Sequence, residues 1–389
     1  MIEDEKSVSK RSLSLVRFNP KVRNELVLRG LNAFSEVRDA KFYYLKGEEH
    51  RVRVELFEAV DAYKQAIQIK PDYAVACFAL GWTYGELGRH TEAIEAYKQA
   101  IRIRPDDAEA HYNLGHAYYD LERYAEAIEA YKQAIRIKLD HAPAHYTLGI
   151  AYANLGRYTE AIEAYKQAIQ IRPDDAGAYY NLGHAYYDLE RYTEAVEAYK
   201  LAIRIKPDYA EAHNNLGVAY RNLRRHAEEI EAYKQAIRIK LDHAPAHYNL
   251  GITYANLGRY TEAVKAYKQA IRIKSDDASA YYGLGFAYIK LVRYIEAVEA
   301  YKQAIRIKSD DAKAHLDLGY AYGKLGKDTE AVEAYKQAIR IKPDYAEAHL
   351  LLGLTYLRMD MHGEALDEYK VLKKLDKESA EKLFKLIYE

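Results

Sequence analysis

The sequence predicts an all-α solenoid of stacked antiparallel helix pairs. Three observations support this fold class. The segment EAYKQAIRI recurs, with small variations, every 34 residues. Leucine, glycine and tyrosine return at fixed places in each copy, and the apolar residues of a copy follow helical spacing with one break. One helix pair cannot bury its apolar face alone, so neighbouring pairs must stack on one another.

Nine copies of the repeat are in register, and each is numbered here from its first alanine. These alanines are Ala74, Ala108, Ala142, Ala176, Ala210, Ala244, Ala278, Ala312 and Ala346. Position 7 is leucine, position 8 is glycine, and positions 11 and 24 are tyrosine in all nine copies. Position 20 is alanine except at Glu229, and position 27 is alanine except at Leu372. The small residues at positions 8 and 20 are expected to let the two helices of a pair approach closely.

Each copy is expected to form two helices, at about positions 2–14 and 18–31, joined by a tight turn. The turn carries glycine in four copies. Proline is expected to end the second helix in four copies, because it lacks a backbone N–H; these residues are Pro105, Pro173, Pro207 and Pro343. Asp106 and Asp174 are expected to cap the helix that follows.

The two ends of the chain depart from this pattern. Residues 1–39 are predicted to be a leader with a capping helix from Pro20 to Arg38, and residues 40–73 a degenerate first repeat with Val54 at its turn. Residues 74–379 hold the nine repeats. Residues 380–389 are predicted to be a C-terminal capping helix, with an apolar stripe formed by Leu383, Phe384 and Ile387.

Composition argues against several classes of function. The 58 basic and 58 acidic side chains cancel, which disfavours binding to nucleic acid or to an anionic membrane. No run of about 18 apolar residues is present, so no membrane span is expected. Cys77 is the single cysteine, which excludes an internal disulfide and favours a reduced compartment, and the protein is predicted to be cytoplasmic. No phosphate loop, nucleophile elbow or metal-ligand cluster occurs, so neither an enzyme nor a cofactor is predicted.

The residues at positions 7, 8, 11, 20, 24 and 27 resemble the tetratricopeptide repeat (TPR) over residues 74–379. The resemblance implies a right-handed superhelix whose concave groove is lined by positions 2, 5, 6, 9, 12 and 13 of the first helices. It also implies a protein or peptide ligand. A chaperone-tail receptor is disfavoured, because its clamp would need lysine at position 5 and asparagine at position 9, and neither occurs.

Position 6 carries asparagine in four repeats: Asn113, Asn181, Asn215 and Asn249. This column resembles the asparagine ladder in the repeat domain of O-linked N-acetylglucosamine transferases, where the amides hold the backbone of an extended peptide. A primary amide both donates and accepts, so it can pair with a peptide unit whatever side chain that unit carries. The alternative is that asparagine is simply common at this position of the repeat.

Position 5 is aromatic in most repeats, and its tyrosines are Tyr112, Tyr146, Tyr180, Tyr248 and Tyr282. A tyrosine ring with a polar tip suits peptide recognition. The same rings could equally pack between neighbouring helices, and the sequence leaves both interpretations open.

Position 13 changes from acidic to basic along the chain. The charged residues that define this change are Asp120, Asp188, Lys290, Lys324 and Arg358. A polypeptide in the groove would then place basic residues near the early repeats and acidic residues near the late ones. The alternative is a drift of solvated charges without a ligand.

The predicted function is therefore a scaffold that binds an extended polypeptide in its groove. The second candidate is a self-assembling scaffold, a homo-oligomer formed through the groove or the terminal helices. The histidines at position 4 are predicted to be hydrogen-bonded interface residues and not zinc ligands. Glu229 is expected to force its helices apart unless Arg225 holds it outward.

Overall fold

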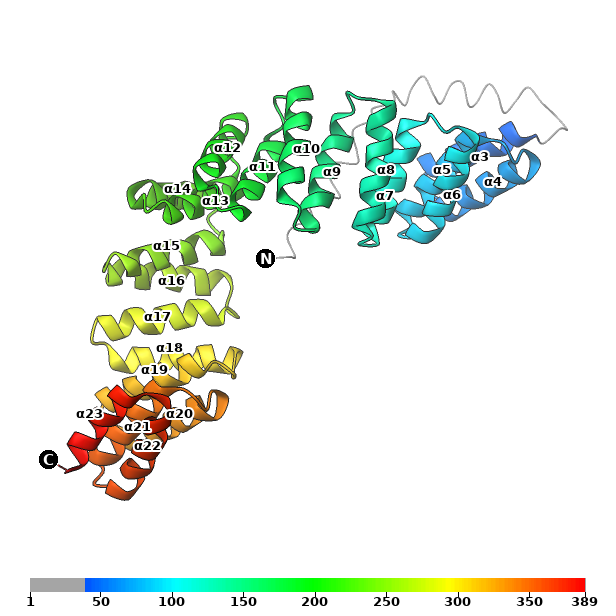
Figure 1. Cartoon of the computed structure of the whole chain (residues 1–389). Coiled ribbons are helices and arrows are strands. Elements are labelled where there is room, and N and C mark those ends of the chain that lie inside the picture. Colours follow the sequence, from blue (N-terminus) through cyan, green and yellow to red (C-terminus); the bar gives the residue numbers. More distant parts are fainter. Residues whose placement is uncertain (1–38, 389) are drawn as a thin grey trace. The chain divides into compact units, whose positions relative to one another are not determined.

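The computed structural model describes residues 39–388, which form 21 helices and no strand (Figure 1). The predicted all-α class is confirmed. The chain divides between Pro173 and Asp174 into two compact units. The helix predicted for residues 20–38 lies outside the described part of the chain.

In the N-terminal unit, first and second helices alternate along the chain. The first helices are α3 (Ala40–Val52), α5 (Ala74–Glu86), α7 (Ala108–Asp120) and α9 (Ala142–Asn154). The second helices are α4 (Leu56–Ile69), α6 (His90–Ile103), α8 (Tyr124–Ile137) and α10 (Tyr158–Ile171).

The C-terminal unit continues the same alternation and ends with one additional helix. Its first helices are α11 (Ala176–Asp188), α13 (Ala210–Asn222), α15 (Ala244–Asn256), α17 (Ala278–Lys290), α19 (Ala312–Lys324) and α21 (Ala346–Arg358). Its second helices are α12 (Tyr192–Ile205), α14 (His226–Ile239), α16 (Tyr260–Ile273), α18 (Tyr294–Ile307), α20 (Asp328–Ile341) and α22 (His362–Leu375). The final helix is α23 (Lys377–Tyr388).

Each helix of a repeat begins one residue earlier than expected, at positions 1 and 17. The predicted caps are therefore wrong by one residue. Asp107 and Asp175, which directly precede the helices, cap α7 and α11 by accepting from the backbone N–H of Ala110 and Ala178 at 3.1 and 3.0 Å. The cap is the second aspartate of each pair because the helix starts at the alanine that follows it.

The turn between the two helices of a repeat takes a left-handed backbone conformation at position 15. Glycine occupies it in four repeats, with φ of 70–72°. Five other repeats use a residue with a side chain in the same conformation, among them Val292 at φ 61°. A branched side chain is strained there, because its Cβ crowds the backbone.

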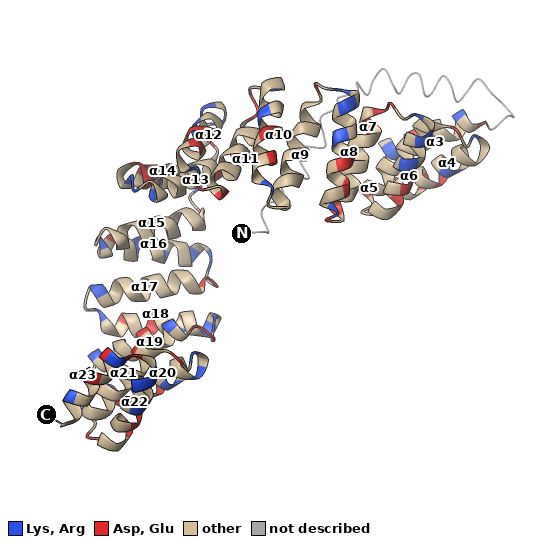
Figure 2. Cartoon of the chain, viewed as in Figure 1, with Lys and Arg blue, Asp and Glu red and all other residues tan. Residues whose placement is uncertain are grey.

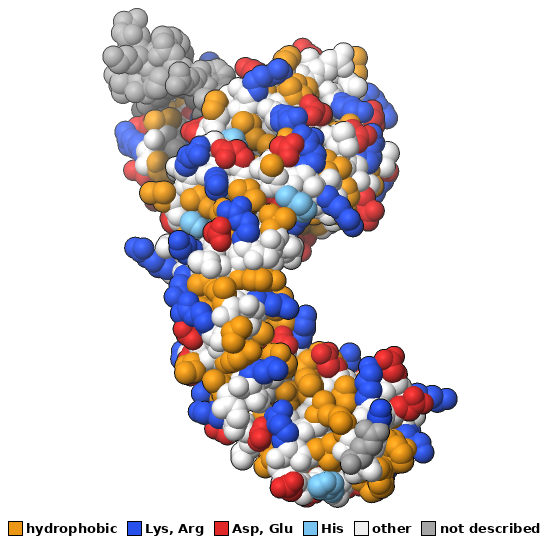
Figure 3. All heavy atoms as spheres, turned by 90° about the vertical axis from the view of Figure 1, so that its left-hand side faces the viewer, with side chains coloured by type: hydrophobic (Ala, Val, Ile, Leu, Met, Phe, Trp, Pro, Cys, Tyr) orange, Lys and Arg blue, Asp and Glu red, His pale blue; other side chains and the backbone are white. Residues whose placement is uncertain are grey.

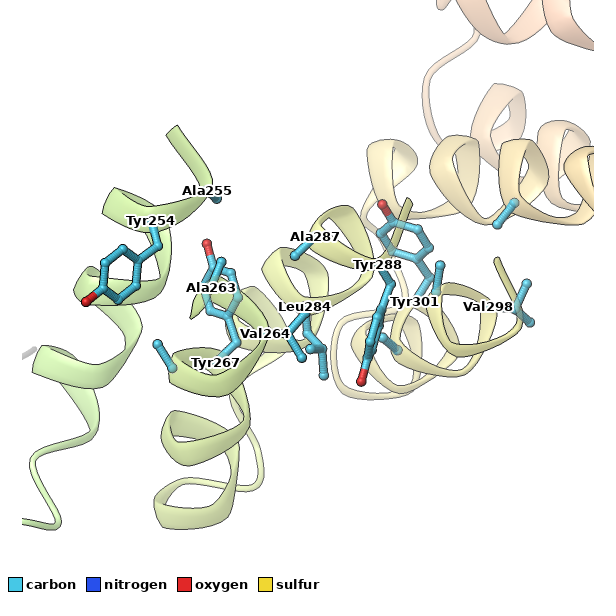
Figure 4. Packing of buried hydrophobic residues seen from close by; sticks show 14 of the residues in the cluster. Tyr254, Ala255, Ala263, Val264, Tyr267, Leu284, Ala287, Tyr288, Val298 and Tyr301 are labelled. Atoms are coloured by element: carbon cyan, nitrogen blue, oxygen red, sulfur yellow. The ribbon is translucent and has the colours of Figure 1, made fainter. Parts of the chain in front are cut away.

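Close contact between glycine and tyrosine sets the spacing within a pair. A Cβ atom added to Gly115 would lie 2.5 Å from the ring of Tyr131, which is fully buried. The same relation recurs between Gly285 and Tyr301 in the C-terminal unit. Figure 4 shows the surrounding core between α15 and α18, where Tyr301 belongs to one buried cluster with Tyr267 and Leu284. The expectation that position 8 permits close approach is confirmed.

The C-terminal helix α23 begins at Lys377, three residues before the predicted cap. Of its apolar residues, Leu383 is fully buried, whereas Phe384 is 43% exposed and lies against the ring of Tyr369. Cys77 is buried in the N-terminal unit, and burial raises the pKa of its thiol to about 11. Within residues 39–388, no helix has the length and apolar character needed to cross a bilayer.

Candidate functional site

All the predicted binding residues lie on first helices, and we call positions 5, 6, 12 and 13 of these helices the first-helix face. The N-terminal unit carries Tyr112, Asn113 and Asp120 on α7 and Tyr146 on α9. The C-terminal unit carries Tyr180, Asn181, Asp188, Asn215, Tyr248, Asn249, Tyr282, Lys290, Lys324 and Arg358. The tyrosines and asparagines are half-buried, and the charged residues at position 13 are exposed.

The tyrosines at position 5 pack within their own repeats. Each ring lies over the buried tyrosine at position 24 of the second helix, with ring centres 5.6–6.0 Å apart; the pairs are Tyr112–Tyr131, Tyr146–Tyr165, Tyr180–Tyr199, Tyr248–Tyr267 and Tyr282–Tyr301. These rings therefore pack against the second helix of the same repeat. Two of them also contact the next repeat, because the ring of Tyr112 lies 4.9 Å from that of His141 and the ring of Tyr180 lies 5.0 Å from that of Tyr209. Each tyrosine at position 5 is half-buried, so part of it remains accessible at the surface.

Hydroxyl groups on this face bond to the next repeat with a constant offset of 35 residues. Tyr119 accepts from the amide of Asn154 at 2.8 Å, and Tyr187 accepts from Asn222 at 3.1 Å. In a third case the tyrosine is the donor: the hydroxyl of Tyr282 donates to the carboxylate of Asp317 at 2.6 Å. Burial, followed by this carboxylate, raises the pKa of Tyr282.

A continuous hydrogen-bonded chain of side chains crosses α11, α13 and α15, and we call it the amide network. Asn215 donates to the hydroxyl of Tyr180 at 2.9 Å, and its Oδ1 accepts from Asn214 at 3.1 Å. Asn249 donates to Oδ1 of Asn214 at 3.1 Å, and its own Oδ1 accepts from Arg221 at 3.4 Å. Two of the four predicted asparagines are thus held in place by their neighbours.

The amide network leaves hydrogen-bonding capacity at Asn215 and Asn249. An asparagine amide has two N–H donors and two acceptor lone pairs. The contacts of the network use one N–H and one lone pair of each side chain. Asn215 also hydrogen-bonds the hydroxyl of Tyr199, so only an acceptor lone pair remains on it. Asn249 keeps one donor and one acceptor, which is the pair that a backbone peptide unit requires.

The other two predicted asparagines stand apart from the network. Asn113 is in the N-terminal unit, where its amide donates to the carbonyl of Glu109 in its own helix at 2.8 Å. Asn181 is half-buried on α11. Sequence reasoning missed Asn214 and Arg221, although Asn214 breaks the aromatic column at position 5 and this departure could have drawn attention to it.

The change of charge at position 13 occurs within the C-terminal unit alone. It begins with Asp188, which lies 3.1 Å from Nδ1 of His184. It continues to Lys290 and Lys324, whose ammonium groups lie 5.3 and 5.2 Å from aromatic rings of their own helices. Arg358 then bonds to Asp328 with its Nε at 3.1 Å. Figure 2 shows that charges of both signs are otherwise interspersed along the helices.

The histidines at position 4 are hydrogen-bonded to the backbone, as expected. In six repeats, Nε2 donates to a carbonyl of the preceding loop at 3.0–3.2 Å; these residues are His111, His145, His213, His247, His315 and His349. Across residues 39–388, no group of three or more potential metal-ligating side chains is present.

Glu229 differs from the expectation. Its side chain points inward and is fully buried, and Arg225 bonds to Glu228 instead. The carboxylate of Glu229 accepts from the hydroxyl of Thr253 at 2.5 Å and from Nδ1 of His226 at 3.0 Å. Arg225 therefore does not hold Glu229 outward, and polar partners within the structure satisfy the buried carboxylate.

Comparison with known families agrees with this architecture. A model described as the cilia and flagella-associated protein 70 C-terminal domain matches residues 106–306, just over half of the chain. A TPR-repeat model matches residues 83–121, 293–326 and 324–360. The chain belongs to this family of tetratricopeptide-repeat proteins. Domains of this class are generally protein-interaction scaffolds and are typically non-catalytic. No curated protein matches the sequence.

Several solved structures are similar to this chain. MamA is 33% identical, covers 42% of this chain and 96% of its own, and has a TM-score of 0.41. YrrB, described as a TPR protein with an unusual peptide-binding site, is 24% identical over 48% of this chain and 96% of its own, with a TM-score of 0.43. The C-terminal part of a TPR protein from Cytophaga hutchinsonii is 17% identical, covers 61% of this chain and 98% of its own, and has a TM-score of 0.54. The last likeness concerns the fold alone.

Proposed function

We propose that this protein is an interaction scaffold whose first-helix face binds an extended polypeptide, with the amide network as the main contact to the peptide backbone. The observation that carries the proposal is the unused donor and acceptor on Asn249, beside the free acceptor of Asn215. Both side chains are oriented by their neighbours before a ligand arrives, so little side-chain entropy is lost on binding.

The half-buried tyrosines supply apolar contact beside these amides. Tyr180 precedes the amide network along the face and Tyr248 lies next to Asn249 in the sequence, and both rings are held by tyrosines beneath them. Fixed aromatic rings lose little conformational freedom when a ligand covers them. The remaining predicted contacts belong to the same proposal. Asn113 is expected to contribute least among them, because its amide is engaged within its own helix.

The charges at position 13 would orient the ligand. Asp188 favours a basic residue near α11, whereas Lys290 and Lys324 favour acidic residues near α17 and α19. These side chains are exposed, so they affect the orientation and the rate of association more than the affinity, and salt should weaken them.

Peptide display on the full chain tests this proposal. The wild-type protein is compared with the double variant Asn215→Ala, Asn249→Ala, and with the control Asn113→Ala, whose amide bonds within its own helix. We expect the wild type and the control to enrich extended peptides with basic residues before acidic ones, and the double variant to lose them while remaining helical. Equal enrichment by all three proteins would contradict the proposal.

Self-assembly is the alternative, because a face that is acidic at one end and basic at the other can also join copies head to tail. Light scattering after size-exclusion chromatography at several concentrations separates the two. A mass that rises with concentration and falls with salt favours the homo-oligomer.

The proposed compartment is the cytoplasm, where Cys77 would stay reduced. The description of the matched family names cilia and flagella. A fluorescent fusion in the source cell distinguishes a diffuse cytoplasmic distribution from one confined to such structures.

A further inference from the structure

A surface pocket of about 410 Å³ lies between α14, α15 and α16, and we call it the α14–α16 pocket. Its floor is apolar and its rim is cationic. The floor consists of Ile237, Leu250, Tyr254 and Ala266, and the cations are Lys234, Arg238 and Lys265. His247, Glu262 and Gln269 complete the lining. None of these residues belongs to the amide network.

The N-terminal unit contains a matched copy of these residues on α8, α9 and α10. Shifting each of the ten lining residues back by 102 positions finds the same amino acid in nine of them. The one difference is Glu163, which stands where α16 has Lys265. The chain therefore supplies its own control for the pocket.

In the matched copy, a lysine covers the tyrosine of the floor. Lys132 lies 5.9 Å from the ring centre of Tyr152 and bonds to Glu129 at 2.9 Å. The same contact, from a lysine of one repeat to the tyrosine ring of the next, recurs elsewhere with the ammonium nitrogen 5.8–5.9 Å from the ring centre. The pairs are Lys98–Tyr118, Lys268–Tyr288, Lys302–Tyr322 and Lys336–Tyr356.

Tyr254 lacks this cover. The cation over the ring of Tyr254 is the guanidinium of Arg259, 4.5 Å from the ring centre. Among the described residues, Lys234 makes no such contact with this ring. Glu231, the counterpart of Glu129, accepts from Gln235 at 2.7 Å and lies 3.6 Å from Arg238. Because its usual carboxylate is engaged elsewhere, Lys234 stands at the rim of the pocket. The ring of Tyr254 is as buried as that of Tyr152, at 7% exposure, so the two copies differ in their cations and not in the depth of the floor.

The rim of the α14–α16 pocket has a positive charge at Lys265, where the matched copy has the negative charge of Glu163. In the matched copy, Glu163 pairs with Lys166 at 3.3 Å. Neither Lys234 nor Lys265 forms an ion pair within residues 39–388, and Glu262 is engaged with Arg259 at 2.9 Å. Apolar and cationic side chains also adjoin elsewhere on the surface in Figure 3, so the distinction of this pocket is its two lysines without an ion pair.

We propose that the α14–α16 pocket binds a short acidic segment of a partner protein. One apolar side chain of the segment enters the pocket lined by Ile237, Leu250 and Tyr254. Carboxylates on either side of it pair with Lys234, Lys265 and Arg238. Apolar contact supplies the burial, and the complementary charge selects and orients the segment. This site is separate from the first-helix face, so a partner could occupy both.

Fluorescence anisotropy on the full chain tests the pocket. The probe is a labelled synthetic peptide with a single Phe flanked by Asp residues, and the control peptide has Ala in place of Phe. Lys265→Glu recreates the charge of the matched copy. Lys302→Glu makes the same change of charge on a second helix outside the pocket.

We expect Lys265→Glu to weaken binding about tenfold, because an attraction becomes a repulsion at the rim, and Lys302→Glu to weaken it less than about twofold. The control peptide should bind more weakly to the wild type. The variant Asn215→Ala, Asn249→Ala should bind the probe as the wild type does, which separates this site from the proposed groove.

The proposal is wrong if the wild type does not bind the probe, if both lysine variants lose the same affinity, or if the control peptide binds equally well. Loss of binding in the double asparagine variant would also overturn it and would place the peptide on the first-helix face. Thermal unfolding followed by circular dichroism checks that each variant is folded.

Discussion

The buried carboxylate of Glu229 and the hydroxyl of Thr253 form a 2.5 Å hydrogen bond between consecutive repeats. Both side chains are almost completely excluded from solvent, at 0% and 1% exposure. Every other repeat has alanine at the position of Glu229, and Thr83 shows that a threonine can occupy the site of Thr253 while bonding only to its own helix. The polar pair thus replaces an apolar contact.

Glu229→Ala is expected to stabilise the protein by about 1 kcal/mol, because it removes a carboxylate that must be kept from water. Thr253→Val is expected to destabilise it by about 1–3 kcal/mol, since it removes a donor from that buried carboxylate. Thermal unfolding, with hydrogen exchange in α14 and α15, measures both changes. If the two variants shift stability in the same direction, this account of the pair is incorrect.

Gly115→Ala is expected to destabilise the protein by about 1–3 kcal/mol, because the new Cβ atom would overlap the ring of Tyr131, which cannot move aside. Gly85→Ala provides the control. No atom lies within 4 Å of its added Cβ, and alanine favours the helix over glycine by about 1 kcal/mol. Chemical denaturation should show opposite shifts, and a neutral result at Gly115 would refute the close-contact role.

Val292→Gly is expected to stabilise the protein by about 1 kcal/mol, because it relieves the left-handed conformation of a branched residue at φ 61°. The reciprocal change Gly156→Val, at φ 70°, should cost a similar amount. Unfolding temperatures of the two variants test the prediction. Unchanged stability in both would mean that the turn adapts freely.

The stability of the last repeat is expected to depend on pH through His349. Its Nδ1 lies 2.5 Å from the carboxylate of Glu368 and its Nε2 lies 3.0 Å from the carbonyl of Pro343, so both ring nitrogens can donate when the ring is protonated. The hydrogen bond to Glu368 raises the pKa of His349. The resulting stabilisation is therefore fully present below the ordinary histidine value of about 6.5 and is lost as the pH rises through the raised pKa.

Amide exchange in α21 and α22, corrected for intrinsic rates, should accordingly be faster at a pH of about 8.5 than at about 6. His349→Gln should remove this difference. His315→Gln in α19 is the control, since its ring bonds to a backbone carbonyl and has no carboxylate partner among the described contacts. A pH dependence that survives His349→Gln would contradict the assignment.

The repeat, the helix pairs and their small-residue contacts could be predicted from the sequence. These features depend on local periodicity and on the size of residues such as Gly115, which the sequence shows directly. The helix starts were missed by one residue, and with them the caps Asp107 and Asp175, because adjacent aspartates leave the choice of cap to the backbone.

The partners of individual side chains were decided by the tertiary structure. Asn215 meets Tyr180 from 35 residues away, and Glu229 turns inward to Thr253. Lys132 lies over the ring of Tyr152, whereas its counterpart Lys234 lies at the rim of a pocket. The sequence alone determined that the chain is a stack of helix pairs, since each helix follows from its own periodic pattern. Which polar groups are engaged and which remain for a ligand depends on contacts between consecutive repeats, and these exist only once the helices have packed.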